Sequence, residues 1–115
     1  MSKWVISDEV SSNGGHIVSK YAGLIDIPQF GWQYSACNEL GCDWVDDNTL
    51  RITAYLDTIS VSSRGGAAAL HPQSMGVYEK TTLTWWGKPV WQSTVRDDSF
   101  LFYDGSKLKH GDNLS

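Results

Sequence analysis

The sequence contains no run of basic residues, and its charge balance is acidic. Nine Lys and Arg residues stand against thirteen Asp and Glu residues in a chain of 115, which gives a net charge of -4. Proteins that bind the phosphate backbone of nucleic acids carry a basic patch or stripe. The composition therefore indicates no nucleic-acid partner.

Long apolar runs are also missing. No window of about 18 apolar residues occurs, so the sequence predicts no membrane span. The first residues, Met1-Ser2-Lys3-Trp4, lack the basic and apolar regions of a signal peptide. The cellular location stays open, and it could be extracellular if the chain belongs to a larger protein.

Cysteine and histidine, the main ligands of structural zinc, are scarce. The three histidines, His16, His71 and His110, show no ligand spacing, and two cysteines alone do not complete a zinc site. We therefore expect no metal and no cofactor. Cys37 and Cys42 stand in a turn-like stretch, where they either form a local disulfide or remain two free thiols.

Aromatic residues are abundant where charged residues are few. Six Trp raise the aromatic share to 12%, against 19% charged residues and only one short helix candidate at 67–70, which Pro72 limits to about a turn. The remaining apolar segments are short, rich in β-branched or aromatic residues, and bounded by Gly, Asp, Asn or Ser. We predict a single all-β domain over 1–115, with strands at 3–7, 16–19, 49–53, 58–61, 76–80, 89–92 and 99–103.

The chain resembles itself at a shift of about 51 residues. The segment Val10–Gly15 recurs as Val61–Gly66, and Asp46–Leu50 recurs as Asp97–Leu101. Composition alone could produce such matches in turns, but two separate segments share one shift. We predict a small barrel or sandwich of two related halves with pseudo-two-fold symmetry.

The predicted halves cover about 3–53 and 54–105. Residues 106–115 are either a polar tail or the start of a further repeat, as in a chain cut from a tandem array. In the second case, a neighbouring module or another copy of the chain would be a partner.

Five short motifs resemble poorly characterised aromatic-rich β modules that occur, often in tandem, in animal and protist multidomain proteins. The motifs are Gly87–Trp91, Phe100–Tyr103, Trp4-Val5, Gly31–Tyr34, and Trp44 with Asp47–Leu50. In those modules the Gly-Lys-Pro half comes first, so the order is rotated here. The resemblance implies that Trp4-Val5 lies beside the strand Phe100–Tyr103. It says little about activity, because no catalytic role is assigned to these modules.

Two pairs of adjacent carboxylates occur in this chain. Asp46/Asp47 and Asp97/Asp98 would point to opposite faces of a strand, which does not suit a catalytic acid-base pair. We interpret them as turn residues that lead into the strands at Thr49 and Ser99. A calcium site built from one pair and nearby carbonyls is the alternative.

The aromatic residues are the stronger functional lead. Most are expected to form the core, namely Trp4, Trp32, Tyr34, Trp44, Tyr78, Phe100 and Phe102. Trp85 and Trp86 are adjacent, so one ring should be exposed, and Trp91 beside Val90 raises the same question. We predict a ligand site of Trp85, Trp86, Trp91, Gln92, Arg96 and Asp98.

This site suggests a non-catalytic recognition module. Exposed indoles beside polar side chains suit carbohydrate or glycoconjugate binding, because the flat ring meets the C–H face of a sugar. The same exposed rings would serve a structural or protein-interaction repeat, where Trp and Arg are common anchors. A small enzyme is the least favoured hypothesis, since no nucleophile motif such as Gly-x-Ser-x-Gly occurs.

Overall fold

The computed structural model describes residues 3–10, 15–20 and 27–105, and within them the chain is almost entirely β. The strands are β1 (Lys3–Ser7), β2 (Ile17–Ser19), β3 (Trp32–Asn38), β4 (Gly41–Asp47), β5 (Arg51–Ala54), β6 (Thr58–Ser62), β7 (Gly76–Trp85), β8 (Lys88–Ser93) and β9 (Phe100–Asp104). A short helix α1 (Gly66–Leu70) and a 3-10 turn (Pro72–Ser74) separate β6 from β7. These helical segments are too short to cross a membrane. The predicted all-β class is confirmed.

All nine strands form one antiparallel sheet in the order β4-β3-β2-β1-β9-β8-β7-β6-β5. Strands β1 to β4 run outward from the centre to one edge, and β5 to β9 run inward from the other edge. The first and last strands meet in the middle, where Trp4 pairs with Tyr103 and Val5 with Phe102. The expected neighbourhood of Trp4-Val5 and the strand Phe100–Tyr103 is therefore confirmed.

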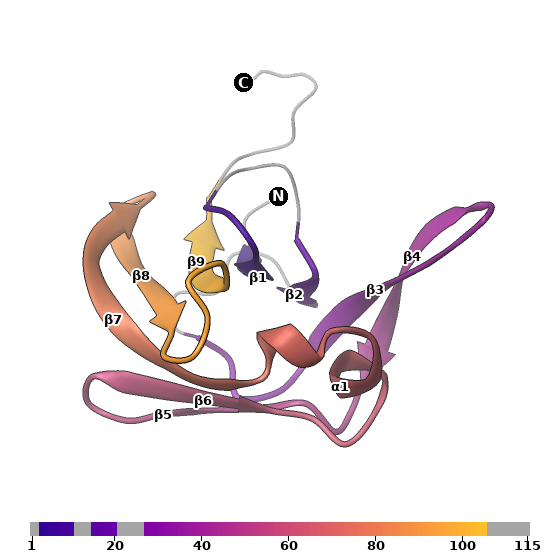
Figure 1. The fold of residues 1–115 in the computed structure, drawn as a ribbon, viewed down its shortest axis with the longest axis horizontal. Coiled ribbons are helices and arrows are strands. Elements are labelled where there is room, and N and C mark those ends of the chain that lie inside the picture. Colours follow the sequence, from indigo (N-terminus) through magenta and orange to yellow (C-terminus); the bar gives the residue numbers. More distant parts are fainter. Residues whose placement is uncertain (1–2, 11–14, 21–26, 106–115) are drawn as a thin grey trace.

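The connection between β4 and β5 forces the sheet to curl. A flat sheet of nine strands would be about 38 Å wide, from eight spacings of about 4.8 Å. Only residues 48–50 join the two edge strands, and such a link spans at most about 14 Å. The edges must therefore approach each other, and the sheet forms a half-barrel with β5 and β6 facing β9 and β1 (Figure 1).

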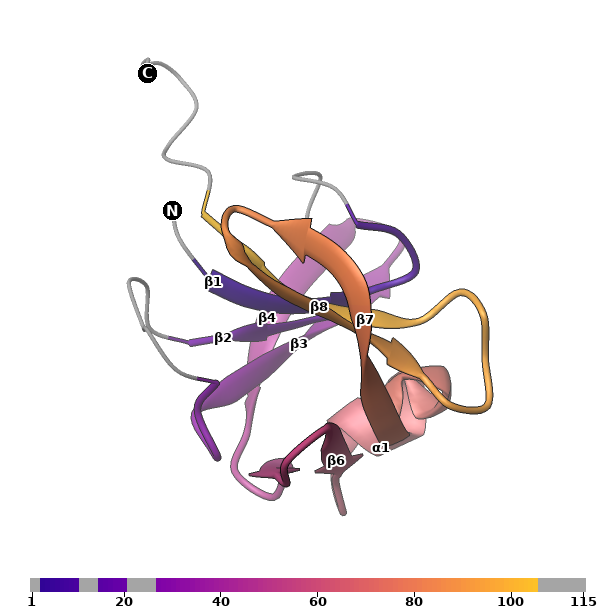
Figure 2. The same cartoon turned by 90° about the vertical axis from the view of Figure 1, so that its left-hand side faces the viewer.

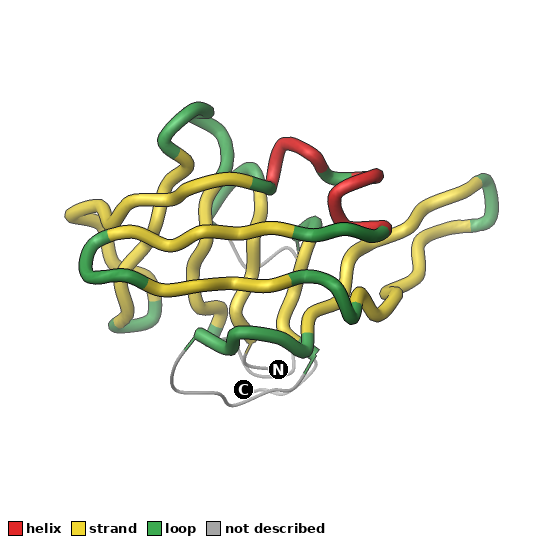
Figure 3. The backbone as a smooth tube through the Cα atoms, turned by 90° about the horizontal axis from the view of Figure 1, so that it is seen from below, coloured by secondary structure: helices red, strands yellow, loops and turns green. Residues whose placement is uncertain are grey.

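Because the sheet curls strongly, strands on opposite sides of the molecule run in crossing directions. Figure 3, seen from the β5–β6 side, shows this hairpin running across the strands behind it. Figure 2 shows β7 arching over the sheet beside β8. The register of that pair shifts between Lys80 and Thr84, so the pairing of the two strands is irregular there.

The main core fills the inside of the curl. Its buried side chains come from strands in both halves of the strand order and from α1: Trp4, Ile6, Ile17, Trp32, Leu50, Ile52, Ile59, Val61, Ala67, Tyr78, Trp91 and Leu101. A smaller cluster of Val5, Val18, Val90 and Phe102 lies on the outer face, packed against Val10, Trp85 and Phe100. The central strands are thus apolar on both faces, which is why consecutive residues such as Trp4, Val5 and Ile6 are all buried.

The structure does not confirm an internal repeat or two-fold symmetry. Trp4 is 3% exposed within β1, whereas Tyr55, its counterpart in the sequence match, is 63% exposed in the turn between β5 and β6. The matched loop at 10–15 falls partly outside the described residues, as does the tail at 106–115. A single curled sheet therefore takes the place of the expected two related halves.

A hairpin of β3 and β4 was not among the predicted strands. It projects from the body of the molecule (Figure 1), and a disulfide joins Cys37 to Cys42, which face each other near its tip. Trp44 was expected in the core, but it is 42% exposed on this hairpin because β4 is an edge strand. The polar residues of β4 hide the strand pattern in the sequence.

The disulfide should stabilise the protein through the short loop that it closes. We expect Cys37→Ser with Cys42→Ser to lower the free energy of unfolding by up to about 2 kcal/mol, since the open chain gains conformational entropy. Urea unfolding without reductant measures the change, and reduced wild-type protein should match the double variant. An unchanged unfolding midpoint would contradict this role.

The corner between β4 and β5 is held by one buried carboxylate. Asp47 is 5% exposed, and its Oδ1 accepts hydrogen bonds from the Thr49 backbone N–H (2.8 Å) and hydroxyl (2.6 Å). Its Oδ2 accepts hydrogen bonds from the Ser63 hydroxyl (2.6 Å) and the Ala67 N–H (3.0 Å). Asp47 therefore fixes the turn itself and also ties it to the segment that enters α1. The turn role predicted for Asp47 is confirmed.

These four donors decide the charge state of Asp47. Burial alone would raise the pKa of its carboxyl group, but the hydrogen bonds from Ser63, Thr49 and Ala67 outweigh burial and lower the pKa to about 2. A lowered pKa in the folded state means that the ionised group stabilises the fold above the ordinary pKa of 3.8. This stabilisation is lost as the pH falls from about 5 toward 2.

We expect Asp47→Asn to lower the free energy of unfolding at pH 7 by about 2 kcal/mol. The same variant should weaken the dependence of stability on pH between about 5 and 2, because the titrating group is gone. Urea unfolding at several pH values measures both effects.

Asp46→Asn is the matched control for this substitution. Its carboxylate is exposed, and surface ion pairs such as the one that it forms contribute little to stability. Equal midpoints for wild type and Asp47→Asn at pH 7 would show that Asp47 does not hold the corner.

Candidate functional site

The six residues predicted as a ligand site do not form one site. Trp91 is only 8% exposed and belongs to the main core, so its expected exposure is wrong. The outer cluster covers Val90 on the opposite face, so both neighbours are buried. The alternation of strand residues predicts one exposed ring only where a single face is covered.

Trp86 is exposed, as predicted for one ring of the Trp85-Trp86 pair. It is 54% exposed in the two-residue turn between β7 and β8, and its φ of 54° is unusual for a residue other than glycine. Its ring meets the Trp85 ring edge to face, with centroids 6.5 Å apart. Trp85 itself packs against the outer cluster.

The polar members of the predicted site lie far from Trp86. Arg96 and Asp98 are exposed in the loop that follows β8, whereas Trp86 precedes this strand. Six strand residues extend about 20 Å, which is longer than a single sugar ring. Gln92 lies near that far loop, where its side-chain amide donates to the Asp97 carbonyl (3.0 Å).

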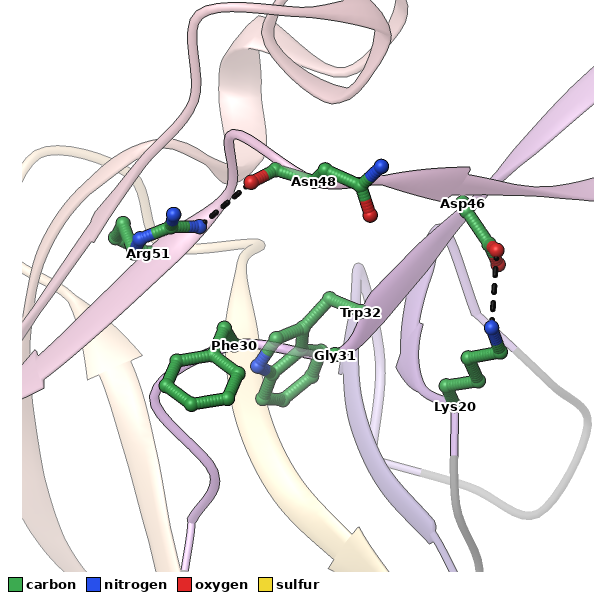
Figure 4. A pocket seen from close by; sticks show the side chains of 7 residues that line it. All are labelled: Lys20, Phe30, Gly31, Trp32, Asp46, Asn48 and Arg51. Carbon is green, nitrogen blue, oxygen red and sulfur yellow. Dashed lines mark hydrogen bonds and ion pairs between the residues drawn. The ribbon is translucent and has the colours of Figure 1, made fainter.

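A different group of aromatic and polar residues surrounds a pocket of about 290 Å³. We call it the Phe30–Arg51 pocket; its lining is Lys20, Phe30, Gly31, Trp32, Asp46, Asn48 and Arg51 (Figure 4). These residues come from the end of β2, the segment before β3, the end of β4, and the corner that leads into β5. The closure of the curled sheet brings them together.

The aromatic side of the pocket comes from Phe30 and Trp32. Gly31 between them has φ of 86°, a conformation that favours glycine. Phe30 is 65% exposed, whereas Trp32 is 1% exposed and its indole N–H donates to the Pro28 carbonyl (3.0 Å). The pocket therefore has one accessible ring beside one fixed ring.

Trp32 lies beside Phe30 in Figure 4, and Arg51 lies above Phe30. Its Nη1 donates to the carbonyl oxygens of Asn48 (2.7 Å) and Leu50 (2.9 Å), and its guanidinium carbon is 5.9 Å from the Phe30 ring centroid. Two carbonyls thus hold the guanidinium in place. Arg51 is exposed, whereas its neighbours Leu50 and Ile52 are buried on the other face of the strand.

Asn48 and Asp46 add hydrogen-bonding groups to the pocket. The Asn48 side-chain amide makes no hydrogen bond with any described residue, and Figure 4 shows it extending between Arg51 and Asp46. Asp46 accepts hydrogen bonds from Gln33 Nε2 (2.9 Å) and Lys20 Nζ (3.0 Å). The bond from Gln33, followed by that from Lys20, lowers the pKa of Asp46, so its carboxylate is ionised at neutral pH.

The Asp46/Asp47 pair does not present two free carboxylates. As predicted for neighbours on a strand, Asp46 is exposed and Asp47 is buried, and each is already bound to donors of the protein. Among the residues that the structure describes, no three His, Cys, Asp or Glu side chains are grouped as metal ligands.

A second polar cluster lies around His16, the residue that precedes β2. His71 Nε2 is 2.7 Å from the Ser35 carbonyl oxygen and 3.1 Å from the Ser35 hydroxyl, and the His71 ring stacks on His16 at 5.0 Å. A carbonyl oxygen can only accept, so Nε2 carries the proton in the shorter contact and cannot act as a base for Ser35. His71 instead binds the backbone of β3 at Ser35, one residue beyond the last β2 partner, Tyr34.

Gly66 allows α1 to pack directly on β3. A Cβ atom at this position would overlap the Tyr34 hydroxyl, so only glycine fits. This contact and the hydrogen bond from the Ala67 N–H to Asp47 hold α1 against β3 and against the corner between β4 and β5.

Comparison of the chain with known protein families, curated proteins and solved structures gives no significant match.

In the sequence, only a weak pattern indicates that the residues of the Phe30–Arg51 pocket could form a site. Phe30-Gly31-Trp32 places two aromatics around a glycine, and Arg51 interrupts two buried aliphatic residues. The link between these segments is a backbone bond from Ile52 N–H to the Gln29 carbonyl (3.0 Å). Such a contact between distant segments has no local sequence pattern.

Proposed function

We propose that this protein is a non-catalytic carbohydrate-binding module, and that the Phe30–Arg51 pocket holds the sugar. The observation that carries the proposal is the exposed ring of Phe30, which lies near the guanidinium of Arg51 and near the Asn48 side-chain amide, whose hydrogen-bonding groups are not used by any described residue. A flat apolar surface next to fixed donors and acceptors matches a sugar ring, which has an apolar C–H face and a rim of hydroxyl groups.

The guanidinium of Arg51 and the carboxylate of Asp46 are ordered before any ligand binds. Arg51 is held by two carbonyls, and Asp46 is held by Gln33 and Lys20. Groups that are already ordered lose little conformational entropy on binding. The Asn48 amide offers both a donor and an acceptor, which suits a hydroxyl group that can do the same.

The size and charge of the pocket indicate what kind of sugar would fit. Its volume of about 290 Å³ is at the lower end of the range of about 300–1,000 Å³ for ligand pockets. One sugar ring is therefore the expected occupant. The positive charge of Lys20 is balanced by Asp46, which leaves Arg51 as a cation that would favour a neutral or acidic sugar.

Protein–protein contact through the β3–β4 hairpin is the second candidate function. Strand β4 is an edge of the sheet, and its Trp44 and Val45 are 42% and 36% exposed. An exposed edge strand with apolar side chains can pair with another chain.

A glycan array with matched variants tests the carbohydrate proposal. We expect wild type to bind at least one glycan, and Phe30→Ala to weaken that binding by about tenfold through loss of the ring contact. Arg51→Gln should have a similar effect by removing a fixed cation. Trp86→Ala is the control, because its exposed ring lies outside the pocket.

Two results would overturn this assignment. If Trp86→Ala abolishes glycan binding and Phe30→Ala does not, the sugar binds at the β7–β8 turn. If no glycan binds and Trp44→Ser abolishes self-association measured by sedimentation, the protein-contact function is favoured. Thermal unfolding of each variant checks that the fold is retained.

A further inference from the structure

A second hollow lies at the end of the curled sheet where β1 and β8 begin. This Trp4–Trp91 cavity has a volume of about 460 Å³, which is within the range of about 300–1,000 Å³ for sites of small ligands. It is lined by Trp4, Trp91, Ile27, Ala54, Pro89 and Lys88, together with the backbone at Gly87. None of these residues lines the Phe30–Arg51 pocket.

The two indoles of this cavity have unsatisfied donors. Trp4 and Trp91 are 3% and 8% exposed, and neither Nε1 has a hydrogen-bond partner among the described residues. Buried N–H groups in proteins are nearly always bonded, and each exception calls for an explanation. Trp32 follows the rule through the Pro28 carbonyl, so the exception is not a property of every core indole here.

Among the described residues that line the cavity, no side chain accepts hydrogen bonds. Their accessible polar group is the Lys88 ammonium, which only donates, and the walls are otherwise apolar or indole rings. Lys88 Nζ lies 5.4 Å from the centroid of the Tyr103 ring. Lys88 forms no ion pair with any of the described residues. A ligand that fits this lining needs an apolar body and a polar end that accepts hydrogen bonds.

We propose that the Trp4–Trp91 cavity binds an amphipathic monocarboxylate, with its apolar part against Trp4, Trp91 and Pro89 and its carboxylate at Lys88. A carboxylate only accepts hydrogen bonds, and its negative charge complements the ammonium group. This site is independent of the carbohydrate proposal, since the two pockets share no residue.

Isothermal titration with decanoate and with 1-decanol tests the proposal. Decanoate should bind with one molecule per chain, and 1-decanol should bind at least tenfold more weakly because it lacks the charge that Lys88 pairs with. Lys88→Gln should weaken decanoate binding about tenfold and leave 1-decanol binding unchanged. Ala54→Phe, which fills the cavity, should abolish the binding of both.

A matched pair of indole variants separates this cavity from general hydrophobic binding. Trp91→Phe keeps an aromatic ring but removes part of the apolar wall of the cavity, so decanoate affinity should fall several-fold. Trp85→Phe makes the same change at a third indole whose Nε1 is also without a partner, on the outer face of the sheet, and should leave the affinity unchanged. Near-ultraviolet circular dichroism confirms that both variants are folded.

The proposal is overturned by any of three results. If the wild-type protein binds no decanoate, the Trp4–Trp91 cavity is not a carboxylate site. Equal affinity for decanoate and 1-decanol, unchanged in Lys88→Gln, excludes a role for the carboxylate. Full decanoate binding by Ala54→Phe places the ligand elsewhere on the protein.

Discussion

The structure depends on a short covalent link between the two edges of its sheet. Strands β4 and β5 are at opposite ends of the strand order, yet only residues 48–50 separate them in the chain. A nine-stranded sheet with this connection cannot lie flat, and the inner core forms because the curl brings β5 and β6 against β1 and β9. The Asp47 carboxylate holds the link at its bend through both oxygens.

The same corner supplies the polar wall of the Phe30–Arg51 pocket. Asn48 is within the link, Arg51 is the first residue of β5, and Asp46 precedes the buried Asp47. Adjacent residues of β4 point to opposite faces, so Asp46 and Asp47 have different roles. The Asp47 carboxylate is buried and accepts hydrogen bonds from backbone and hydroxyl donors, whereas Asp46 faces solvent beside Lys20. A site built on a closed corner is more rigid than one on a free loop, which lowers the entropic cost of binding.

Local sequence patterns predicted much of the strand content. The segment at 3–7 coincides with β1, and the segments at 58–61 and 99–103 agree with β6 and β9 within one residue. These strands have β-branched or aromatic residues with clear boundaries. The β3–β4 hairpin was missed because an exposed edge strand contains the polar residues that otherwise indicate turns, as at Asp43 and Asp46.

The candidate site could not be read from the sequence for two physical reasons. Prediction of an exposed Trp91 assumed a sheet covered on one face, but clusters on both faces bury the central strands. The pocket around Phe30 depends on contacts between distant segments, such as Ile52 N–H with the Gln29 carbonyl. Such contacts follow from closure of the sheet and not from any local pattern.

Because β1 and β9 pair at the centre of the sheet, the strand order does not depend on which half of the chain comes first. Lys3 faces Asp104 across this ladder, so a short linker could join the two positions without moving a strand. A chain opened within a turn and rejoined there would keep every ladder while its sequence motifs changed order. Alignments that assume a fixed order of motifs would therefore fail to detect a protein with the same sheet and a rotated sequence.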